Sequence, residues 1–185
     1  MEIEAKYAIP SEQVFRQLQA QETLGAFQLR ESGAAALHDT YLDTADHAVW
    51  QAGYALRLRE KGDACVMTLK ALAGGAGPVK RREELELTLP QPTPPTLWPP
   101  SAIREQLLEV IGEQPLQPLF DLHQLRHERT VMAGERAVCL MSLDAVTLTG
   151  EQRRTQFFVL EAELLPDGTE QDLAAIMQAL QEAWQ

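Results

Sequence analysis

Apolar and polar residues alternate along much of this chain, and alternation with a period of two predicts β-strands because successive side chains of a strand point to opposite faces. Strands are predicted over residues 2–9, 36–44, 54–61, 64–71, 80–89, 122–132, 136–149 and 154–165. The third and fourth of these segments predict a hairpin that turns at Lys61-Gly62-Asp63. We therefore expect a mainly antiparallel sheet.

Three segments instead place apolar residues at helical spacing and predict amphipathic helices over residues 11–20, 101–112 and 169–184. Ser11 and Ser101 precede the first two helices as N-caps, and Thr169 with Asp172 makes a start that resembles a capping box. Residues 90–100 contain six of the 11 prolines, so this stretch is expected to be a connector without helix or central strand.

Many strands with a few helices predict an α+β protein in which β-structure dominates. The chain has 185 residues, of which 45% are hydrophobic and 23% charged, so it has enough apolar side chains for a sizeable core. No repeat of fixed period is present, and neither side of the proline-rich stretch has enough strands to close a sheet alone. Residues 1–185 are therefore interpreted as a single domain.

The net charge of −11 argues against a general DNA- or RNA-binding protein, because nonspecific affinity for nucleic acids comes from positive charge meeting phosphate. No apolar run approaches the roughly 18 residues that a membrane-spanning helix needs. The first residues, Met1-Glu2-Ile3-Glu4, show no secretory pattern, and Cys65 and Cys139 do not form a disulfide framework. We expect a cytoplasmic protein without membrane or nucleic-acid partners.

Positive charge is concentrated in one part of the chain, since seven of the 16 Lys and Arg residues lie between Arg57 and Arg82 and none follows Arg154. An anionic ligand therefore remains compatible with the acidic total, provided that the positive field is local, as in a cleft.

The predicted strands have one apolar face and one charged face, and the charged faces carry both signs. The positions on the charged faces are Glu2, Glu4, Lys6, Arg57, Arg59, Lys70, Arg82, Glu84, Glu86, Asp144, Glu161 and Glu163. One interpretation is an antiparallel sheet whose polar side faces water. The other is a sheet closed around a shared lumen, in which the charges need neutralising partners. Divalent cations neutralise carboxylates and phosphate neutralises Lys and Arg, so the second interpretation predicts metal-assisted phosphoryl transfer.

These motifs, in this order, resemble the CYTH superfamily, the triphosphate tunnel metalloenzymes. The resemblance is carried by Glu2-Ile3-Glu4-Ala5-Lys6, Tyr41-Leu42-Asp43-Thr44, Leu56-Arg57-Leu58-Arg59, Thr68-Leu69-Lys70, Arg82-Glu83-Glu84-Leu85-Glu86, Arg126, Leu143-Asp144 and Glu161-Ala162-Glu163. It covers nearly the whole chain and implies an eight-stranded antiparallel closed β-barrel with helices packed outside.

The resemblance also implies a role for each charged residue. The ligands of Mg²⁺ or Mn²⁺ would be Glu2, Glu4, Glu161 and Glu163, with Glu84, Glu86 and Asp144 at a second metal or orienting the attacking water. The triphosphate-binding residues would be Lys6, Arg57, Arg59, Lys70, Arg82 and Arg126, and the catalytic residues Lys6, Arg57, Glu84 and Asp144. Arginine suits this role because its planar fork matches two phosphate oxygens, whereas lysine acts as a point charge.

One position departs from the family pattern. Many relatives have a basic residue a few positions after the aspartate that matches Asp144, whereas this chain reads Ala145-Val146-Thr147-Leu148-Thr149. Arg153 and Arg154 are the candidate replacements, and the sequence does not decide which group fills this place.

The expected function is metal-dependent hydrolysis of a small-molecule triphosphate, with inorganic tripolyphosphate cleaved to pyrophosphate and phosphate as the leading case. Three alternatives stay open, namely a class IV adenylate cyclase-like activity, thiamine triphosphatase activity, and a non-catalytic module that binds polyphosphate or a nucleotide. The sequence also leaves open the physiological triphosphate, the choice between Mg²⁺ and Mn²⁺, the number of metals, and whether the protein forms a homodimer.

Overall fold

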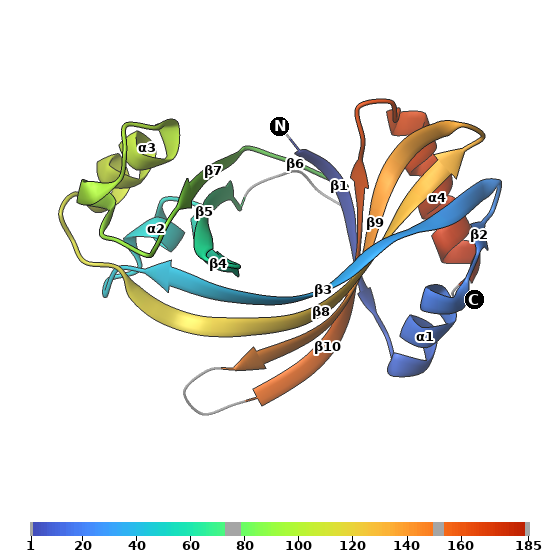
Figure 1. Ribbon diagram of the computed structural model, residues 1–185, viewed down its shortest axis with the longest axis horizontal. Coiled ribbons are helices and arrows are strands. Elements are labelled where there is room, and N and C mark those ends of the chain that lie inside the picture. The colour runs from blue at the N-terminus through green and yellow to red at the C-terminus, as the bar shows by residue number, and fades with distance from the viewer. Residues whose placement is uncertain (1, 73–78, 150–153, 184–185) are drawn as a thin grey trace.

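The computed structural model describes residues 2–72, 79–149 and 154–183, which contain ten β-strands and four α-helices (Figure 1). The strands are β1 (Glu2–Ile9), β2 (Thr23–Leu24), β3 (Phe27–Asp43), β4 (Tyr54–Lys61), β5 (Ala64–Ala71), β6 (Val79–Arg82), β7 (Glu84–Leu89), β8 (Gln117–Ala133), β9 (Arg136–Thr149) and β10 (Arg154–Leu164). The helices are α1 (Glu12–Ala20), α2 (Ala48–Gln51), α3 (Ala102–Ile111) and α4 (Glu170–Ala183), and Pro95–Leu97 form a short 3₁₀ turn. The prediction of a β-dominated α+β protein is thus confirmed.

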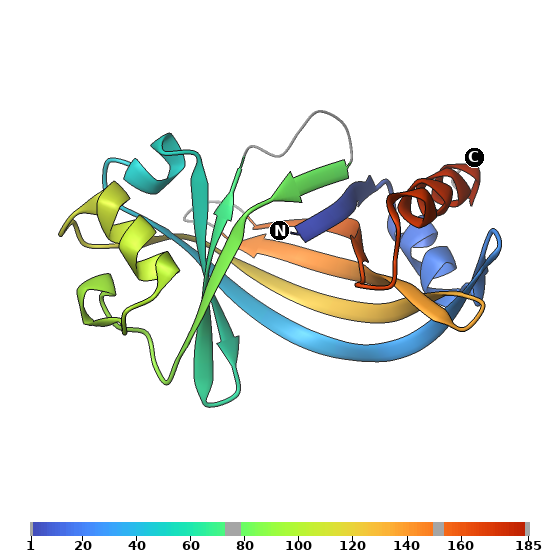
Figure 2. The same cartoon turned by 90° about the horizontal axis from the view of Figure 1, so that it is seen from above.

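All ten strands belong to one curved antiparallel sheet (Figures 1 and 2). Its strand order is β6-β1-β10-β9-β8-β3-β4-β5-β7, with β2 paired to β3 beside this path. The two ends of the order, β6 and β7, are consecutive in the sequence and are separated by Glu83 alone. The sheet therefore curls until its first and last strands meet in one stretch of chain.

The expectation of a closed eight-stranded barrel is wrong in both strand number and closure. Alternation predicted one strand over residues 80–89, but its pairing changes at Glu83. Among the described strands, β6 pairs with β1 and β7 pairs with β5, and neither half has a second neighbour. The hydrogen-bonded ladder is therefore open between β6 and β7. Alternation could not reveal this change, because Arg82 and Glu84 keep the same inward face on both sides of Glu83.

The hairpin and the starts of the first and last helices match their predictions. The β4–β5 pair runs from Tyr54 opposite Ala71 to Lys61 opposite Ala64. The Ser11 hydroxyl accepts a hydrogen bond from the Val14 N–H at 3.3 Å, as expected of an N-cap of α1.

The capping box of α4 is also present, because the Thr169 N–H donates to Asp172 at 2.9 Å and the Asp172 N–H donates to the Thr169 hydroxyl at 3.1 Å. Ser101 differs from its prediction, since its hydroxyl donates to the Pro99 carbonyl and makes no capping bond to α3. Residue 184, the predicted end of the last helix, lies outside the described residues. No helix in the described part of the chain is long and apolar enough to cross a membrane.

Two pairs of helices lie at opposite ends of the molecule (Figure 2), and each pair covers one hydrophobic core on the outer face of the sheet. One lies between α1, α4 and the strands β1, β8, β9 and β10, with Leu18, Leu160 and Ile176 at most 2% exposed. The other lies between α2, α3 and the strands β4, β5 and β7, and buries Val49 and Leu107. Because the helices cover the apolar faces, the charged faces of the same strands are left to line the inside of the curved sheet.

Candidate active site

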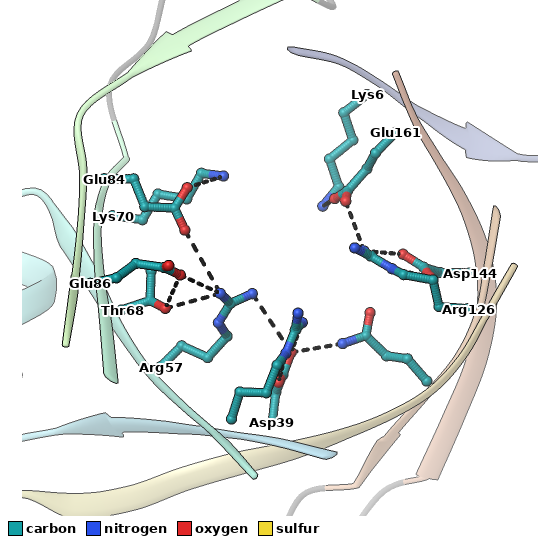
Figure 3. A network of polar contacts seen from close by, with 12 residues as sticks. Lys6, Asp39, Arg57, Thr68, Lys70, Glu84, Glu86, Arg126, Asp144 and Glu161 are labelled. Carbon is teal, nitrogen blue, oxygen red and sulfur yellow. Dashed lines mark hydrogen bonds and ion pairs between the residues drawn. The ribbon is translucent and has the colours of Figure 1, made fainter. Parts of the chain in front are cut away.

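The inner face of the sheet lines one cavity of about 710 Å³ (Figure 3). Its charged lining consists of the six cations Lys6, Arg57, Arg59, Lys70, Arg82 and Arg126 and the seven carboxylates Glu4, Asp39, Glu84, Glu86, Asp144, Glu161 and Glu163. Twelve of the thirteen site residues predicted from the sequence are in this set. Glu2, the thirteenth, is opposite Arg82 in the β1–β6 pairing, and its side chain lies outside the described part of the structure. The roles of these residues stay predictions, but the geometry brings them together.

On one wall, Lys6, Arg126, Asp144 and Glu161 form a connected group of ion pairs. Lys6 Nζ lies 2.6 Å from Glu161 Oε1, and Arg126 Nη2 donates to Glu161 Oε2 at 3.0 Å. Arg126 also binds Asp144 side-on, with Nε donating to Oδ1 at 2.8 Å and Nη2 to Oδ2 at 2.7 Å. Strand register explains the group, because Lys6 stands opposite Glu161 and Arg126 stands opposite Asp144.

The charges of this wall stabilise one another. Burial alone would raise the pKa of the Glu161 carboxyl, but Lys6, and after it Arg126 and Lys70, outweigh burial and lower this pKa to about 2. Burial would lower the pKa of the Arg126 guanidinium, yet its hydrogen bonds and attraction to Asp144, with the charge of Glu161, raise that pKa above its ordinary value. Both groups are therefore charged at neutral pH.

On the facing wall, Arg57 lies among Thr68, Lys70, Glu84 and Glu86 (Figure 3). Arg57 Nη2 donates to the Thr68 hydroxyl at 3.0 Å and lies 3.7 Å from Glu84 and 3.8 Å from Glu86. Lys70 Nζ lies 3.2 Å from the Glu84 carboxylate, and these two residues stand opposite each other on β5 and β7. Arg57 is thus held by longer contacts than Arg126, and its Nε has no hydrogen-bond partner in the described part of the chain.

Glu4 connects the two walls. Its side chain is buried and contacts Arg82 and, at 3.6 Å, Lys70. It also stands directly opposite Glu163 in the β1–β10 pairing, and both residues line the cavity. Because two carboxylates that face each other across a strand pair repel, this position favours a cation between or beside them.

The donor chemistry of the cavity fits a divalent metal. Glu4, Glu161 and Glu163 would supply the carboxylate oxygens that Mg²⁺ and Mn²⁺ prefer. No three His, Cys, Asp or Glu side chains of residues 2–72, 79–149 and 154–183 are grouped as a preformed metal site. The reason is visible in the ion pairs, since Glu4 and Glu161 each bind Lys or Arg. A metal would have to take these carboxylates from their cationic partners.

Sequence reasoning missed three polar residues of the lining, Asp39, Gln124 and Ser142. Asp39 is 1% exposed and accepts two hydrogen bonds from Arg59, from Nε at 2.6 Å and from Nη2 at 2.7 Å. It accepts a third from Gln124 Nε2 at 2.7 Å. The sequence signal that could have found them is the two-residue period of a strand, since residues two apart point to the same face. Asp39 is two residues from Tyr41, and Gln124 is two residues from the predicted site residue Arg126.

The predicted replacement for the missing basic residue after Asp144 is not found among the described residues. Val146 occupies the next inward position on β9. Arg154 is exposed at the start of β10, opposite Thr149, and is not part of the cavity lining. Arg153 lies outside the described residues.

A second, mainly apolar cavity of about 700 Å³ adjoins the charged one. The two cavities share the lining residues Tyr41, Ala55, Leu72, Leu122 and Phe157. Its walls also include Trp50 of α2 and Phe120 of β8, whose ring stacks on that of Tyr41 with 4.8 Å between centroids. The charged cavity therefore has an aromatic, apolar neighbour at one end.

Comparisons with known proteins agree with this architecture. Among solved structures, the chain is similar to HpAC1 from Hippeastrum, a protein described as having a dominant triphosphatase activity, with 20% identity, a TM-score of 0.71, and coverage of 100% of this chain and 88% of that one. It is also similar to a provisionally assigned adenylate cyclase from Bacillus halodurans, with 22% identity, a TM-score of 0.64, and coverage of 99% and 89%. The PH1819 protein of Pyrococcus horikoshii OT3 matches with 17% identity, a TM-score of 0.57, and coverage of 99% and 88%.

These structural similarities support the fold, and no curated protein sequence matches the chain significantly. The family assignment comes from the sequence itself, because the model of the CYTH domain matches residues 1–183. The chain belongs to the CYTH domain family.

Proposed function

We propose that this protein hydrolyses a terminal phosphoanhydride bond of a small-molecule triphosphate in a divalent-metal-dependent reaction, with inorganic tripolyphosphate as the leading substrate. The observation that carries the proposal is a single cavity in which six Lys and Arg side chains from five strands are interleaved with carboxylates. Membership of the CYTH family supports it, as does the triphosphatase activity described for the Hippeastrum relative.

In this proposal the six cations bind the phosphate oxygens, and they differ in how firmly the protein holds them. Arg59 and Arg126 are each fixed by a side-on carboxylate, so they form a rigid part of the binding surface. Arg57, whose contacts to carboxylates are 3.7 to 3.9 Å long, exchanges these contacts for phosphate oxygens at lower cost. Arg57 and Lys6 then stabilise the charge on the transferring and leaving oxygens.

The reaction is a displacement at the terminal phosphorus. A water oxygen forms a bond to this phosphorus while the bond to the bridging oxygen breaks, and the electron pair of that bond leaves with pyrophosphate. Glu84 is the proposed acceptor of the water proton, because its carboxylate lines the cavity and lies beside Arg57 and Lys70. Asp144 is less suited to this task, since both of its oxygens bind Arg126.

A divalent cation held by Glu4, Glu161 and Glu163 would supply positive charge and polarise phosphate oxygens. The lining supports this requirement, because its carboxylates outnumber its cations by seven to six. A triphosphate adds further negative charge, so the protein alone does not neutralise it.

A second candidate function is hydrolysis of an organic triphosphate such as thiamine triphosphate or ATP. The observation that favours it is the apolar cavity beside the charged one, which could accept the organic part of such a substrate while the phosphates occupy the charged lining. This candidate shares its chemistry with the first and differs in the substrate bound.

The proposal is tested by measuring phosphate release by the purified full-length chain from tripolyphosphate, ATP and thiamine triphosphate, each with Mg²⁺, Mn²⁺ or EDTA. We expect release from tripolyphosphate with metal and none with EDTA. Glu84→Gln should remove turnover, whereas Glu12→Gln, on the exposed face of α1, should leave it unchanged. Absence of release from all three compounds refutes the proposal. Tight binding that persists in EDTA without turnover would indicate a binding module, and cyclic AMP formed from ATP would indicate a cyclase.

A further inference from the structure

We infer that Asp39 is a positioning residue of the proposed phosphate-binding cavity, and that its carboxylate, supported by Gln124, fixes the guanidinium plane of Arg59 for phosphate binding. This inference rests on the proposed function, because it assumes that Arg59 binds phosphate. It assigns Asp39 no contact with the substrate.

Asp39 and Arg59 form a side-on pair across two neighbouring strands. Asp39 of β3 stands directly opposite Arg59 of β4, and both residues line the cavity. The two hydrogen bonds, at 2.6 and 2.7 Å, join the Nε–Nη2 edge of the guanidinium to both carboxylate oxygens. Such a bidentate pair fixes the plane as well as the position of the arginine, and it leaves Nη1 outside the pairing.

Asp39 is itself held in place by both neighbouring strands. β3 lies between β4 and β8, and Asp39 receives hydrogen bonds from both neighbours. Gln124 of β8 donates to Oδ2 at 2.7 Å, and this residue is itself buried. With three donors on two oxygens and 1% of its surface exposed, Asp39 has a single well-defined orientation.

A carboxylate partner stabilises the Arg59 cation in this cavity. Burial lowers the pKa of the Arg59 guanidinium and the nearby Arg126 charge lowers it further, yet Asp39 outweighs both and the pKa is raised. Asp39 therefore stabilises a cation that its surroundings would otherwise disfavour. A long arginine side chain that is already ordered also loses less conformational entropy when phosphate binds.

The structure offers an internal comparison, because Arg126 and Asp144 repeat the same arrangement on the neighbouring strands. Arg126 of β8 stands opposite Asp144 of β9 and is bound side-on through Nε and Nη2. Asp144 is 1% exposed, like Asp39. The two Asp–Arg pairs thus fix two of the six cations, whereas Arg57 has no bidentate carboxylate among its described contacts.

Asp39 Oδ2 also lies 3.9 Å from Arg57 Nη1, which is too long for a hydrogen bond, so its two hydrogen bonds to Arg59 are the stronger link. If Asp39 acts through Arg59, its removal matters mainly while Arg59 is present. We would measure the dissociation constant of tripolyphosphate by calorimetry, and KM and kcat by phosphate release, for the full-length protein. Asp39→Asn should raise the dissociation constant and KM about tenfold in the wild-type background, since displaced binding groups lose affinity steeply. In an Arg59→Gln background, which keeps a donor for Asp39, the same substitution should change the dissociation constant less than about twofold.

Asp43→Asn is the matched control. Asp43 is a buried aspartate of the same strand, 2% exposed, and its carboxylate accepts hydrogen bonds from the N–H groups of Thr44, Val49 and Trp50. It does not line the charged cavity. Asp43→Asn should lower the melting temperature while leaving tripolyphosphate binding unchanged. If Asp39→Asn proves unfolded, Gln124→Leu serves instead, because it removes one donor from Asp39 and leaves the Asp39–Arg59 pair in place.

The outcomes separate this inference from the proposed function. Equal weakening by Asp39→Asn, or by Gln124→Leu, in both backgrounds overturns the inference even if tripolyphosphate is hydrolysed. Weakening by Asp43→Asn to the same extent also overturns it, because the effect would then be one of stability. If the wild type binds tripolyphosphate without hydrolysing it, the proposed activity fails while the dependence on Arg59 is still measured. If the wild type does not bind tripolyphosphate, both fail.

Discussion

The low pKa of Glu161 predicts a loss of stability in acid that a single substitution can isolate. The ordinary pKa of this carboxyl is 4.5, and in the folded protein it falls to about 2. At about 1.4 kcal/mol per pH unit, this difference corresponds to about 3 kcal/mol. Because the folded pKa lies below the unfolded one, the stabilisation is complete above pH 4.5 and is lost as the pH falls through about 2.

Glu161→Gln removes the titrating group while keeping its size. Urea unfolding should show the variant less stable than the wild type by about 3 kcal/mol at pH 6 and by about 1 kcal/mol at pH 3. Glu12→Gln is the control, because Glu12 makes an exposed pair with Arg16 at 2.7 Å, and such pairs contribute less than about 1 kcal/mol. An equal loss of stability at both pH values for Glu161→Gln would refute the reasoning. The ion pairs of Glu161 with Lys6 and Arg126 would then not be the cause of that loss.

Three further predictions concern binding and turnover. Arg57→Ala should weaken tripolyphosphate binding by at least about tenfold in calorimetry because a charge-assisted contact is lost, and an unchanged dissociation constant would contradict its role. Glu4→Gln should abolish metal-dependent phosphate release, because a carboxylate opposite Glu163 is removed; wild-type rates with Mg²⁺ and Mn²⁺ would exclude Glu4 as a ligand. Trp50→Ala should raise KM several-fold for an organic triphosphate and leave KM for tripolyphosphate unchanged, because Trp50 lines the apolar cavity and not the charged one. Equal changes in KM for both substrates would argue against the second candidate function.

The sequence was most informative about which side chains share a face. Alternation assigned Glu4 and Lys6 to one face of β1 and Arg57 and Arg59 to one face of β4, and all four line the cavity. This prediction is reliable because the period of a strand is fixed by backbone geometry and the opposite faces carry apolar residues that must be buried. The same rule places Asp39 on the face of Tyr41, two residues further along β3, and both residues line the cavity.

Pairing partners could not be predicted in the same way. Periodicity gives the face of Asp144 but not the residue across from it, so the family resemblance suggested a metal ligand or a water-orienting group. Register shows that Asp144 faces Arg126 and binds it through both oxygens, and its expected role toward a metal or water stays a prediction. Alternation also cannot predict that the segment over residues 79–89 changes its pairing partner at Glu83. That change depends on the positions of β1 and β5, which pair with the two halves of the segment and are distant from each other in the sequence.

The carboxylates of the cavity therefore have a part in stability as well as in the proposed chemistry. Six cations that face one cavity repel one another, and side-on or close carboxylates such as Asp39, Asp144 and Glu161 offset this repulsion within the protein. A phosphate chain can replace a carboxylate as the partner of a cation, provided that the released carboxylate finds another positive charge. Aspartates that are bound to arginine by two hydrogen bonds are poorly placed for this exchange, whereas Glu84, which lies 3.2 Å from Lys70 and 3.7 Å from Arg57, is better placed. In the proposed function, this division between the fixed Asp–Arg pairs and the longer contacts of Glu84 lets one set of charges both stabilise the fold and bind a triphosphate.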